Sequence, residues 1–184
     1  MLYKFLSGLA KGVTHCIFRV KVVGKENVPK DGGMILAVNH KSNWDPIFAG
    51  AYCPRPLRFM AKADLFKNKL FGGLIKKLGA FPIQRGRGDI GAIKGAFSIL
   101  KNNDAMLIFP EGHRIKNGKR VKAKLGVSMI AVYAKVPVIP LCISGEYKPF
   151  HKVTVTFGKP ITFEEYYGKK PDNETLQTLA DEVM

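Results

Sequence analysis

Short strand-like runs alternate with helix-like segments along the chain, and this alternation limits the folds that the sequence can adopt. Apolar runs bounded by turn residues, as at 34–38, 57–61, 105–109 and 136–144, have the length and composition of buried strands. The segments between them carry apolar side chains at helical spacing. Strands that alternate with helices form β-α-β units, so we predict a three-layer α/β domain with a largely parallel or mixed central sheet.

The expected elements cover most of the 184 residues, which are enough for one domain with its own core. Strands are predicted at 18–23, 34–38, 57–61, 79–85, 105–109, 136–144 and 153–157, and helices at 2–20, 46–52, 65–78, 90–100, 125–134 and 173–183. No internal repeat and no long linker interrupts this order. We therefore expect a single α/β domain over residues 21–184, preceded by an N-terminal helix over residues 1–20.

The N-terminal segment has the pattern of a basic amphipathic helix. Its apolar stripe comprises Leu2, Phe5, Leu6, Leu9, Val13, Cys16, Ile17 and Val20, and its other side carries Lys4, Lys11, Thr14, His15 and Arg19. The lysines make it a poor membrane-spanning helix, and no small-residue cleavage site of a signal peptide follows it. Such a helix can lie in a membrane interface or pack on the core of its own domain. We predict the interfacial position for residues 1–20.

The chain has a large excess of positive charge, with 30 Lys and Arg against 14 Asp and Glu and a formal net charge of +16. This excess indicates an anionic partner, which can be nucleic acid, an anionic membrane surface or a phosphorylated substrate. The sequence has no zinc-finger, RNP or basic-zipper pattern, so nucleic acid is not the expected partner. Cys16, Cys53 and Cys142 lie far apart, and His113 and His151 lack the spacing of metal ligands, so no metal site is predicted.

A histidine and an aspartate lie between the strand at 34–38 and the helix that starts at Asp45-Pro46. His40 and Asp45 are five positions apart, a spacing that puts two side chains on opposite faces of a strand and well apart on a helix. Only a loop or tight turn brings them together. Asp45 can then accept a hydrogen bond from one imidazole nitrogen of His40, which leaves the other nitrogen basic, as a general base requires.

The nucleophile for such a base is not evident in the chain. The sequence contains no Gly-x-Ser-x-Gly segment, which would mark an enzyme serine. A base at His40 can instead act on a hydroxyl group of the substrate. The alternative interpretation of this segment is a capped helix with an incidental histidine.

Two arginine-bearing segments follow later strands, where ligands bind in open α/β sheets. Phe109-Pro110-Glu111-Gly112-His113-Arg114 offers an arginine that can bind phosphate bidentately and a glycine that allows close backbone approach. Its alternative is a strand-terminating turn with a surface ion pair. The segment from Arg85 to Gly91 contains Gly-x-Gly-x-x-Gly, but Pro82 in the preceding strand and the nearby arginines argue against a dinucleotide site. Arg85 beside a helix N-terminus is a reasonable phosphate ligand.

Four segments of the chain resemble, in the same order, the four sequence blocks of the glycerolipid acyltransferase family. They are Asn39-His40-Lys41-Ser42-Asn43-Trp44-Asp45, Gly79-Ala80-Phe81-Pro82-Ile83-Gln84-Arg85, Phe109-Pro110-Glu111-Gly112-His113-Arg114 and Val136-Pro137-Val138-Ile139-Pro140. Together they span most of residues 24–160. Within the family, the chain most resembles the 1-acylglycerol-3-phosphate O-acyltransferase branch.

The resemblance implies transfer of an acyl group from a thioester, on coenzyme A or acyl carrier protein, to the sn-2 hydroxyl of lysophosphatidate. The product would be phosphatidate, for phospholipid biosynthesis. On the family pattern, His40 takes the hydroxyl proton and Asp45 orients His40, and no cofactor is needed besides the acyl donor. The positions that the family pattern assigns to the glycerol phosphate of the acceptor are Arg85, Glu111, Gly112 and Arg114.

The chain departs from the family pattern at two positions, because His113 stands where Thr or Ser is common and Gln84 where an acidic residue is frequent. Many relatives also carry spanning segments, whereas this chain has only the helix at 2–20, so we expect monotopic or peripheral attachment at the cytoplasmic face of the cell membrane. Two other functions stay open. One is the same chemistry on another lysophospholipid or on glycerol 3-phosphate, and the other is a non-catalytic module that binds anionic lipid or nucleic acid.

Overall fold

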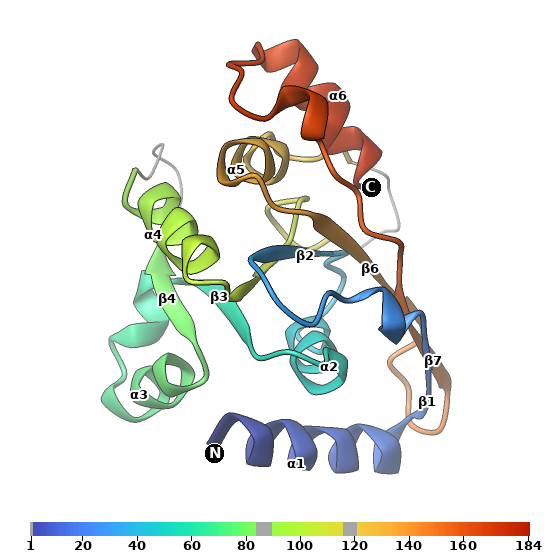
Figure 1. The fold of residues 1–184 in the computed structure, drawn as a ribbon. Helices are drawn as coiled ribbons and strands as arrows, with labels where there is room; N and C mark the ends of the chain where they lie inside the picture. The colour runs from blue at the N-terminus through green and yellow to red at the C-terminus, as the bar shows by residue number, and fades with distance from the viewer. Residues whose placement is uncertain (1, 84–89, 116–120) are drawn as a thin grey trace.

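The computed structural model describes residues 2–83, 90–115 and 121–184 and has helices on both faces of one central sheet (Figure 1). Within these residues the strands are β1 (Arg19–Val23), β2 (Met34–Val38), β3 (Leu57–Lys62), β4 (Ala80–Ile83), β5 (Ala105–Ile108), β6 (Val138–Gly145) and β7 (Lys152–Phe157). The α-helices are α1 (Leu2–Ile17), α2 (Asp45–Tyr52), α3 (Lys69–Lys77), α4 (Ile90–Lys101), α5 (Gly126–Ala134) and α6 (Asn173–Glu182). Short 3-10 turns occupy Lys25–Asn27, Ala63–Phe66 and Glu164–Tyr166.

The described strands form one seven-stranded sheet in the order β1-β7-β6-β2-β5-β3-β4. Neighbouring strands run parallel except β6 and β7, which are antiparallel. The exception follows from the connection, because only a short turn at 146–151 joins these two strands, whereas parallel neighbours need a crossover. The predicted α/β fold with a largely parallel or mixed sheet is confirmed.

The central strand β2 is covered on both faces of the sheet, which explains its continuous apolar run. Met34, Leu36 and Val38 face a core cluster shared with α2, β6 and β7. Ile35 and Ala37 face a second cluster, to which α4, α5 and α6 contribute. Figure 1 shows these layers, with α4, α5 and α6 above the sheet and α2 below it.

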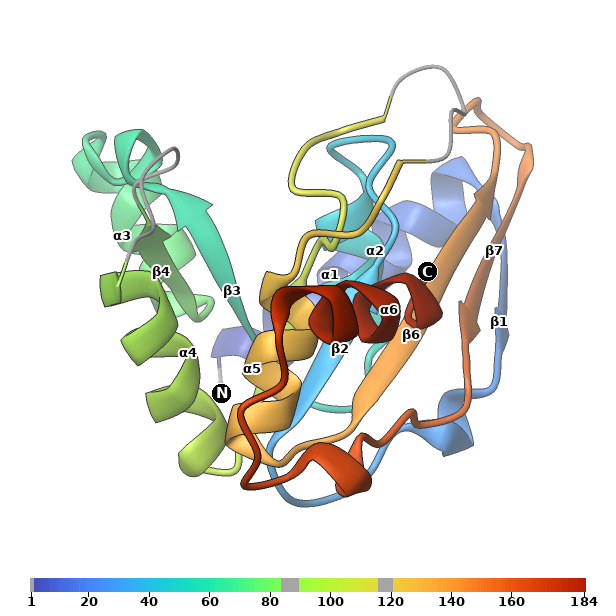
Figure 2. The same cartoon turned by 90° about the horizontal axis from the view of Figure 1, so that it is seen from above.

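The carboxyl ends of β2 and β5 lie at the same end of the sheet, because the two strands are parallel and Met34 pairs with Ala105. β7 runs antiparallel to β6, and β1 runs parallel to β7, so β1 and β7 both begin at this end of the sheet (Figure 2). The topology therefore gathers the loop after β2, the loop after β5 and the turn between β6 and β7.

α1 packs across α2, on the side of α2 that faces away from the sheet (Figure 1). Thr14, which the sequence placed on the polar side of the helix, is fully buried. Its hydroxyl lies 2.8 Å from the Tyr52 hydroxyl and also donates to the Ala10 carbonyl oxygen at 2.8 Å. The prediction of a solvent-facing position for Thr14 was wrong. Its hydroxyl group is satisfied by a hydrogen bond to the backbone of its own helix, so it can be buried.

The helix also ends earlier than predicted. It stops at Ile17 instead of continuing to residue 20, because Arg19 begins the β1 strand and pairs with Lys152 of β7. The helix predicted from residue 65 likewise starts later, at Lys69, after the 3-10 turn at Ala63–Phe66.

The outer side of α1 is apolar and exposed. Its large exposed side chains are Leu2, Phe5, Leu9 and Val13. None of the helices in the described part of the chain combines the length and apolar character needed to cross a membrane.

Candidate active site

The loop after β2 brings His40 and Asp45 together, as the sequence predicted. The Nδ1 atom of His40 lies 3.0 Å from Oδ2 of Asp45. Asp45 is the first residue of α2 and is fully buried, whereas the His40 side chain keeps 15% of its surface exposed. Oδ2 of Asp45 also accepts the backbone N–H groups of Lys41 and Ser42, at 2.7 and 2.6 Å. The carboxylate thus holds the whole turn closed.

The donors around Asp45 determine which nitrogen of His40 is basic. Burial alone would raise the pKa of Asp45, but hydrogen bonds from His40, Tyr147, Ser42 and Lys41 outweigh it and lower the pKa below its ordinary value. The carboxylate is therefore ionised at neutral pH, and His40 must donate to it through Nδ1–H. In the neutral imidazole, Nε2 then carries the lone pair, and no described residue donates a hydrogen bond to it.

Tyr147, in the turn between β6 and β7, completes the set of donors. Its hydroxyl donates to Oδ1 of Asp45. Burial and the adjacent carboxylate raise the pKa of Tyr147 far above its ordinary value, so the phenol stays protonated. The side chain of Lys41 lies over the Tyr147 ring, with Nζ 4.6 Å from the ring centroid, and donates to the Gly145 carbonyl oxygen at 2.6 Å. Sequence reasoning missed Tyr147, because no local pattern links it to Asp45.

Asn39 fixes the start of the same loop to β6. Its side-chain oxygen accepts the Ile143 N–H at 2.7 Å, and its side-chain nitrogen donates to the Ile143 carbonyl oxygen at 3.1 Å. These bonds continue the pairing of β2 with β6 by one residue and leave His40 as the first residue free of the sheet.

The segment after β5 supports His40 from the other side. The Phe109 ring stacks on the imidazole, with ring centroids 3.9 Å apart and an interplanar angle of 20°. Oε2 of Glu111 accepts the backbone N–H of His40 at 2.7 Å, and the Ile115 N–H donates to the His40 carbonyl oxygen at 2.8 Å. Glu111 is almost completely buried, and this burial raises its pKa. The geometry gives Glu111 a positioning contact to His40; a role at the phosphate stays a prediction.

The remaining predicted phosphate ligands are only partly described. Arg114 is exposed, and its Nη1 donates to Oδ1 of Asn43 at 2.9 Å, which joins the loop after β5 to the loop after β2. Gly112 adopts a left-handed conformation, with φ of 74°, which an L side chain rarely adopts. Arg85 and the glycine-rich residues up to 89 lie outside the described residues.

An apolar cavity of about 410 Å³ opens beside the catalytic loop. It lies between α1, α2, β3 and α3, and Asn43 of the loop is part of its wall. Further lining residues are Leu6, Ala10, Ile47, Gly50, Phe59 and Phe71. Its position connects the His40 loop with the inner face of α1.

The model of a protein family described as Acyltransferase matches residues 19–144. A protein of Streptococcus pneumoniae named 1-acyl-sn-glycerol-3-phosphate acyltransferase is 34% identical over 193 residues, which cover 100% of this chain and 71% of that protein. A protein of Bacillus subtilis with the same name is 31% identical over 186 residues, 98% of this chain and 92% of that protein.

A solved structure supports the same relationship. The crystal structure of the 1-acyl-sn-glycerophosphate (LPA) acyltransferase PlsC from Thermotoga maritima superposes with a TM-score of 0.76 and 28% sequence identity, over 98% of this chain and 76% of that one. The four sequence blocks, the sheet and the match to the family model agree, and the chain belongs to the acyltransferase family.

Proposed function

We propose that the protein is a 1-acyl-sn-glycerol-3-phosphate acyltransferase, which moves an acyl group from a thioester to the sn-2 hydroxyl of lysophosphatidate. The observation that carries the proposal is the 3.0 Å contact between Nδ1 of His40 and Oδ2 of the fully buried Asp45, because it leaves Nε2 of His40 to act as the base. The names of the relatives from Streptococcus pneumoniae and Bacillus subtilis support the same substrate. The acyl donor is coenzyme A or acyl carrier protein, and no cofactor takes part.

The chemistry is a direct transfer. His40 Nε2 takes the proton of the sn-2 hydroxyl while the hydroxyl oxygen attacks the thioester carbonyl carbon. When the tetrahedral intermediate collapses, the carbon–sulfur bond breaks, and the thiolate leaves and receives the proton from His40. Asp45 holds the ring so that Nδ1–H points inward, and it stabilises the imidazolium that forms between the two steps.

The acceptor phosphate binds on the Arg114 side of the site. Arg114 is exposed and reaches Asn43 in the catalytic loop, so its remaining guanidinium N–H groups are close to the reacting hydroxyl. Gly112 lets the backbone approach the ligand, and Arg85 supplies a second cation. Glu111 acts mainly through the His40 backbone, because a carboxylate next to a phosphate would repel it.

The acyl chain occupies the apolar cavity between α1, α2, β3 and α3. The cavity begins at Asn43 in the catalytic loop, so a carbonyl carbon held near His40 can extend its chain directly into apolar surroundings. Polar groups are few along the wall, which matches a ligand without hydrogen-bonding groups of its own.

Residues 1–20 act as the membrane-interface segment of an otherwise single domain at 21–184. The apolar outer side of α1 has no cover among the described residues, and the net charge of +16 favours an anionic bilayer. Replacement of Phe5 and Leu9 with Ser should therefore weaken flotation with vesicles without changing the fold, because both side chains are exposed.

The decisive test removes the base and its orienting partner. His40→Ala and Asp45→Asn should each lower phosphatidate formation by roughly 10²- to 10⁴-fold, with the cooperative melt retained. Asp104→Asn is the matched control, because Asp104 is a partly exposed aspartate outside the catalytic loop, paired with Arg58. Normal turnover by the His40 variant would remove His40 as the base. Crossing both donors with lysophosphatidate, other lysophospholipids and glycerol 3-phosphate then identifies the substrates.

A further inference from the structure

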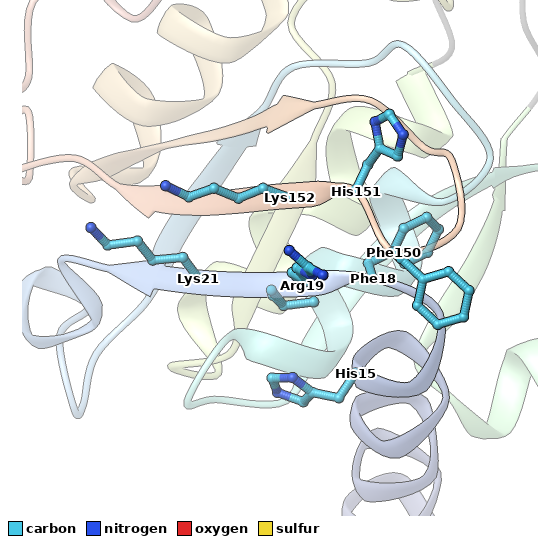
Figure 3. Close-up of a pocket in the computed structure, with 8 residues that line it drawn as sticks. His15, Phe18, Arg19, Lys21, Phe150, His151 and Lys152 are labelled. Atoms are coloured by element: carbon cyan, nitrogen blue, oxygen red, sulfur yellow. The ribbon is translucent and has the colours of Figure 1, made fainter.

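A shallow basic pocket lies outside the catalytic loop, on the exposed edge of the sheet. It has a volume of about 680 Å³ and lies between the carboxyl end of α1 and the first residues of β1 and β7 (Figure 3). Arg19 and Lys152 are aligned neighbours on these two parallel strands, and Lys21 lies two residues further along β1, so all three side chains emerge on one face. His15 and His151 complete the rim.

The three cations of this pocket have no acidic partner among the residues that the structure describes. In the described part of the chain no ion pair includes Arg19, Lys21 or Lys152. Glu146 lies 3.6 Å from the rim residue His151, but it pairs more closely with Lys148, at 2.8 Å. Three like charges on adjacent strands repel each other, and an anion bound between them would relieve this repulsion.

An exposed aromatic side chain marks the border of the pocket with α1. Phe150 keeps 70% of its surface exposed and has a φ of 64°, a conformation that a bulky side chain rarely adopts. Its backbone N–H donates to the carbonyl oxygen of Ile17 at 2.6 Å, which attaches it to the last turn of α1. Phe150 is therefore held at the carboxyl end of α1, whose exposed large apolar side chains extend from Leu2 to Val13.

We propose that Arg19, Lys21 and Lys152 form a binding site for the anionic headgroup of a bilayer phospholipid, with Phe150 inserted beside it. The inference rests on the proposed membrane attachment through α1 and adds a headgroup site to it. Cations placed directly beside an apolar interfacial surface match the arrangement of a phospholipid, whose phosphate lies just outside its acyl chains.

The site is separate from the catalytic centre. Phe18 lies between the two, since it lines the pocket and also contacts Trp44 of the catalytic loop and Tyr147, with ring centroids 5.3 and 6.0 Å away. A headgroup in the pocket therefore orients the protein on the bilayer and leaves His40 free for the acceptor. A soluble acidic carrier protein or the phosphates of coenzyme A would also seek cations, but neither explains the exposed phenylalanine.

The test uses the full chain and vesicles of phosphatidylcholine alone or with a minor fraction of phosphatidylglycerol. The site variant carries Arg19→Gln, Lys21→Gln and Lys152→Gln. Its matched control carries Lys159→Gln, Lys169→Gln and Lys170→Gln, which remove the same charge from exposed positions after β7, before α6. Each cation at an anionic surface contributes about fivefold to partitioning, so the site variant should lose roughly 100-fold in binding to anionic vesicles, and the control less than about fivefold.

Phe150→Asn tests the aromatic contact, because Asn tolerates the left-handed backbone that Phe150 adopts. This variant should bind both kinds of vesicle more weakly, whereas the site variant should lose binding only to anionic ones. Equal losses in the site variant and the control variant would reduce the effect to net charge and overturn the site.

A vesicle-free assay with water-soluble substrates separates this proposal from the proposed function. The site variant should keep its KM for the acyl thioester there, and a raised KM would assign the pocket to the donor instead. If the unmodified chain failed to transfer acyl groups, the proposed function would fall, while the vesicle results would still decide the headgroup site.

Discussion

Tyr147 donates a hydrogen bond to Asp45 across 102 residues of chain, and it is the one donor that reaches Oδ1 of this carboxylate in the described structure. Oδ2 receives the other three donors, from His40, Lys41 and Ser42. The phenol therefore prevents the carboxylate from rotating about its last bond. The orientation of the imidazole consequently depends on the turn between β6 and β7 as well as on its own loop.

Tyr147→Phe should lower kcat by roughly 10- to 100-fold, the value of a hydrogen bond to a charged group, while KM for both substrates stays the same. The ring is retained, so the contacts with Phe18 and Phe48 persist. Tyr133→Phe, at an exposed position, is the control and should be silent. A change confined to KM would mean that Tyr147 contacts a substrate.

Tyr147→Phe should also change how the free energy of unfolding depends on pH. Asp45 has a lowered pKa when folded, so its contribution to stability is present above the unfolded value of about 3.9 and is lost as the pH falls through the folded pKa. Tyr147→Phe weakens that contribution. Urea unfolding should therefore show a larger stability gap between the two proteins at neutral pH than near pH ~3.

Substitutions of Glu111 can distinguish a positioning contact with His40 from a contact with the acceptor phosphate. Glu111→Gln keeps an oxygen that can accept the His40 N–H, so kcat should stay within about tenfold, whereas Glu111→Ala should lower kcat by more because the buried N–H loses its partner. KM for lysophosphatidate should change little in both variants. A rise in that KM alone, measured by varying the acceptor at saturating donor, would support phosphate binding by Glu111.

The raised pKa of Glu111 predicts an opposite pH trend in stability. Burial is the main cause of the raised pKa, so ionisation of Glu111 costs stability as the pH rises through its folded pKa. Glu111→Gln lacks this loss. Relative to the unmodified protein, the Gln variant should gain stability in urea unfolding as the pH rises above about 4.3, the ordinary pKa of Glu, and a constant difference would contradict the assignment.

Arg114→Ala should raise KM for lysophosphatidate by roughly 10- to 100-fold with little effect on the KM of the donor, because a charge-assisted bond to phosphate is lost. Arg114→Lys should recover only part of this effect, since lysine cannot bind bidentately. Arg58→Ala is the control, because Arg58 is an exposed arginine paired with Asp104. Unchanged acceptor saturation in Arg114→Ala would place the phosphate elsewhere.

Gly50 offers a way to shorten the apolar cavity. An added Cβ at this position would meet only the Tyr3 hydroxyl, at 3.7 Å, so a larger side chain can extend from α2 into the space. Gly50→Met should reduce kcat/KM for long-chain donors relative to shorter ones by roughly tenfold, because about two methylene groups lose their apolar contacts. Gly50→Ala is the control for the helix itself. An unchanged chain-length profile in the Met variant would exclude this cavity as the acyl site.

The strands and helices were predictable from the sequence because their apolar periodicity is local. The buried run 34–38 and the alternation at 153–157 both reappear as strands, with the ends shifted by at most a residue. The contact between His40 and Asp45 was predictable for the same reason, since five residues and a helix start restrict the loop strongly. Local patterns therefore carry the elements and the centre of the site.

Contacts between distant segments were not predictable. Tyr147 joins Asp45 only because β6 lies beside β2 in the sheet, and the sequence does not encode strand order in any local pattern. Thr14 was predicted to face solvent. Its burial depends on a contact with the Tyr52 hydroxyl of α2, which no local pattern indicates. The contact of Glu111 with the His40 backbone similarly requires that β5 neighbours β2.

The attachment of α1 to α2 has a consequence for the geometry of turnover. Tyr3 and Ser7 bond to the Gly50 carbonyl oxygen, and Thr14 contacts Tyr52, so α1 cannot sink into a bilayer without α2, whose first residue is Asp45. If α1 lies in the interface, its contacts with α2 then fix the distance between His40 and the bilayer surface. The reaction would follow the surface density of the acceptor in two dimensions, and diluting the acceptor with inert lipid would slow it at constant bulk concentration.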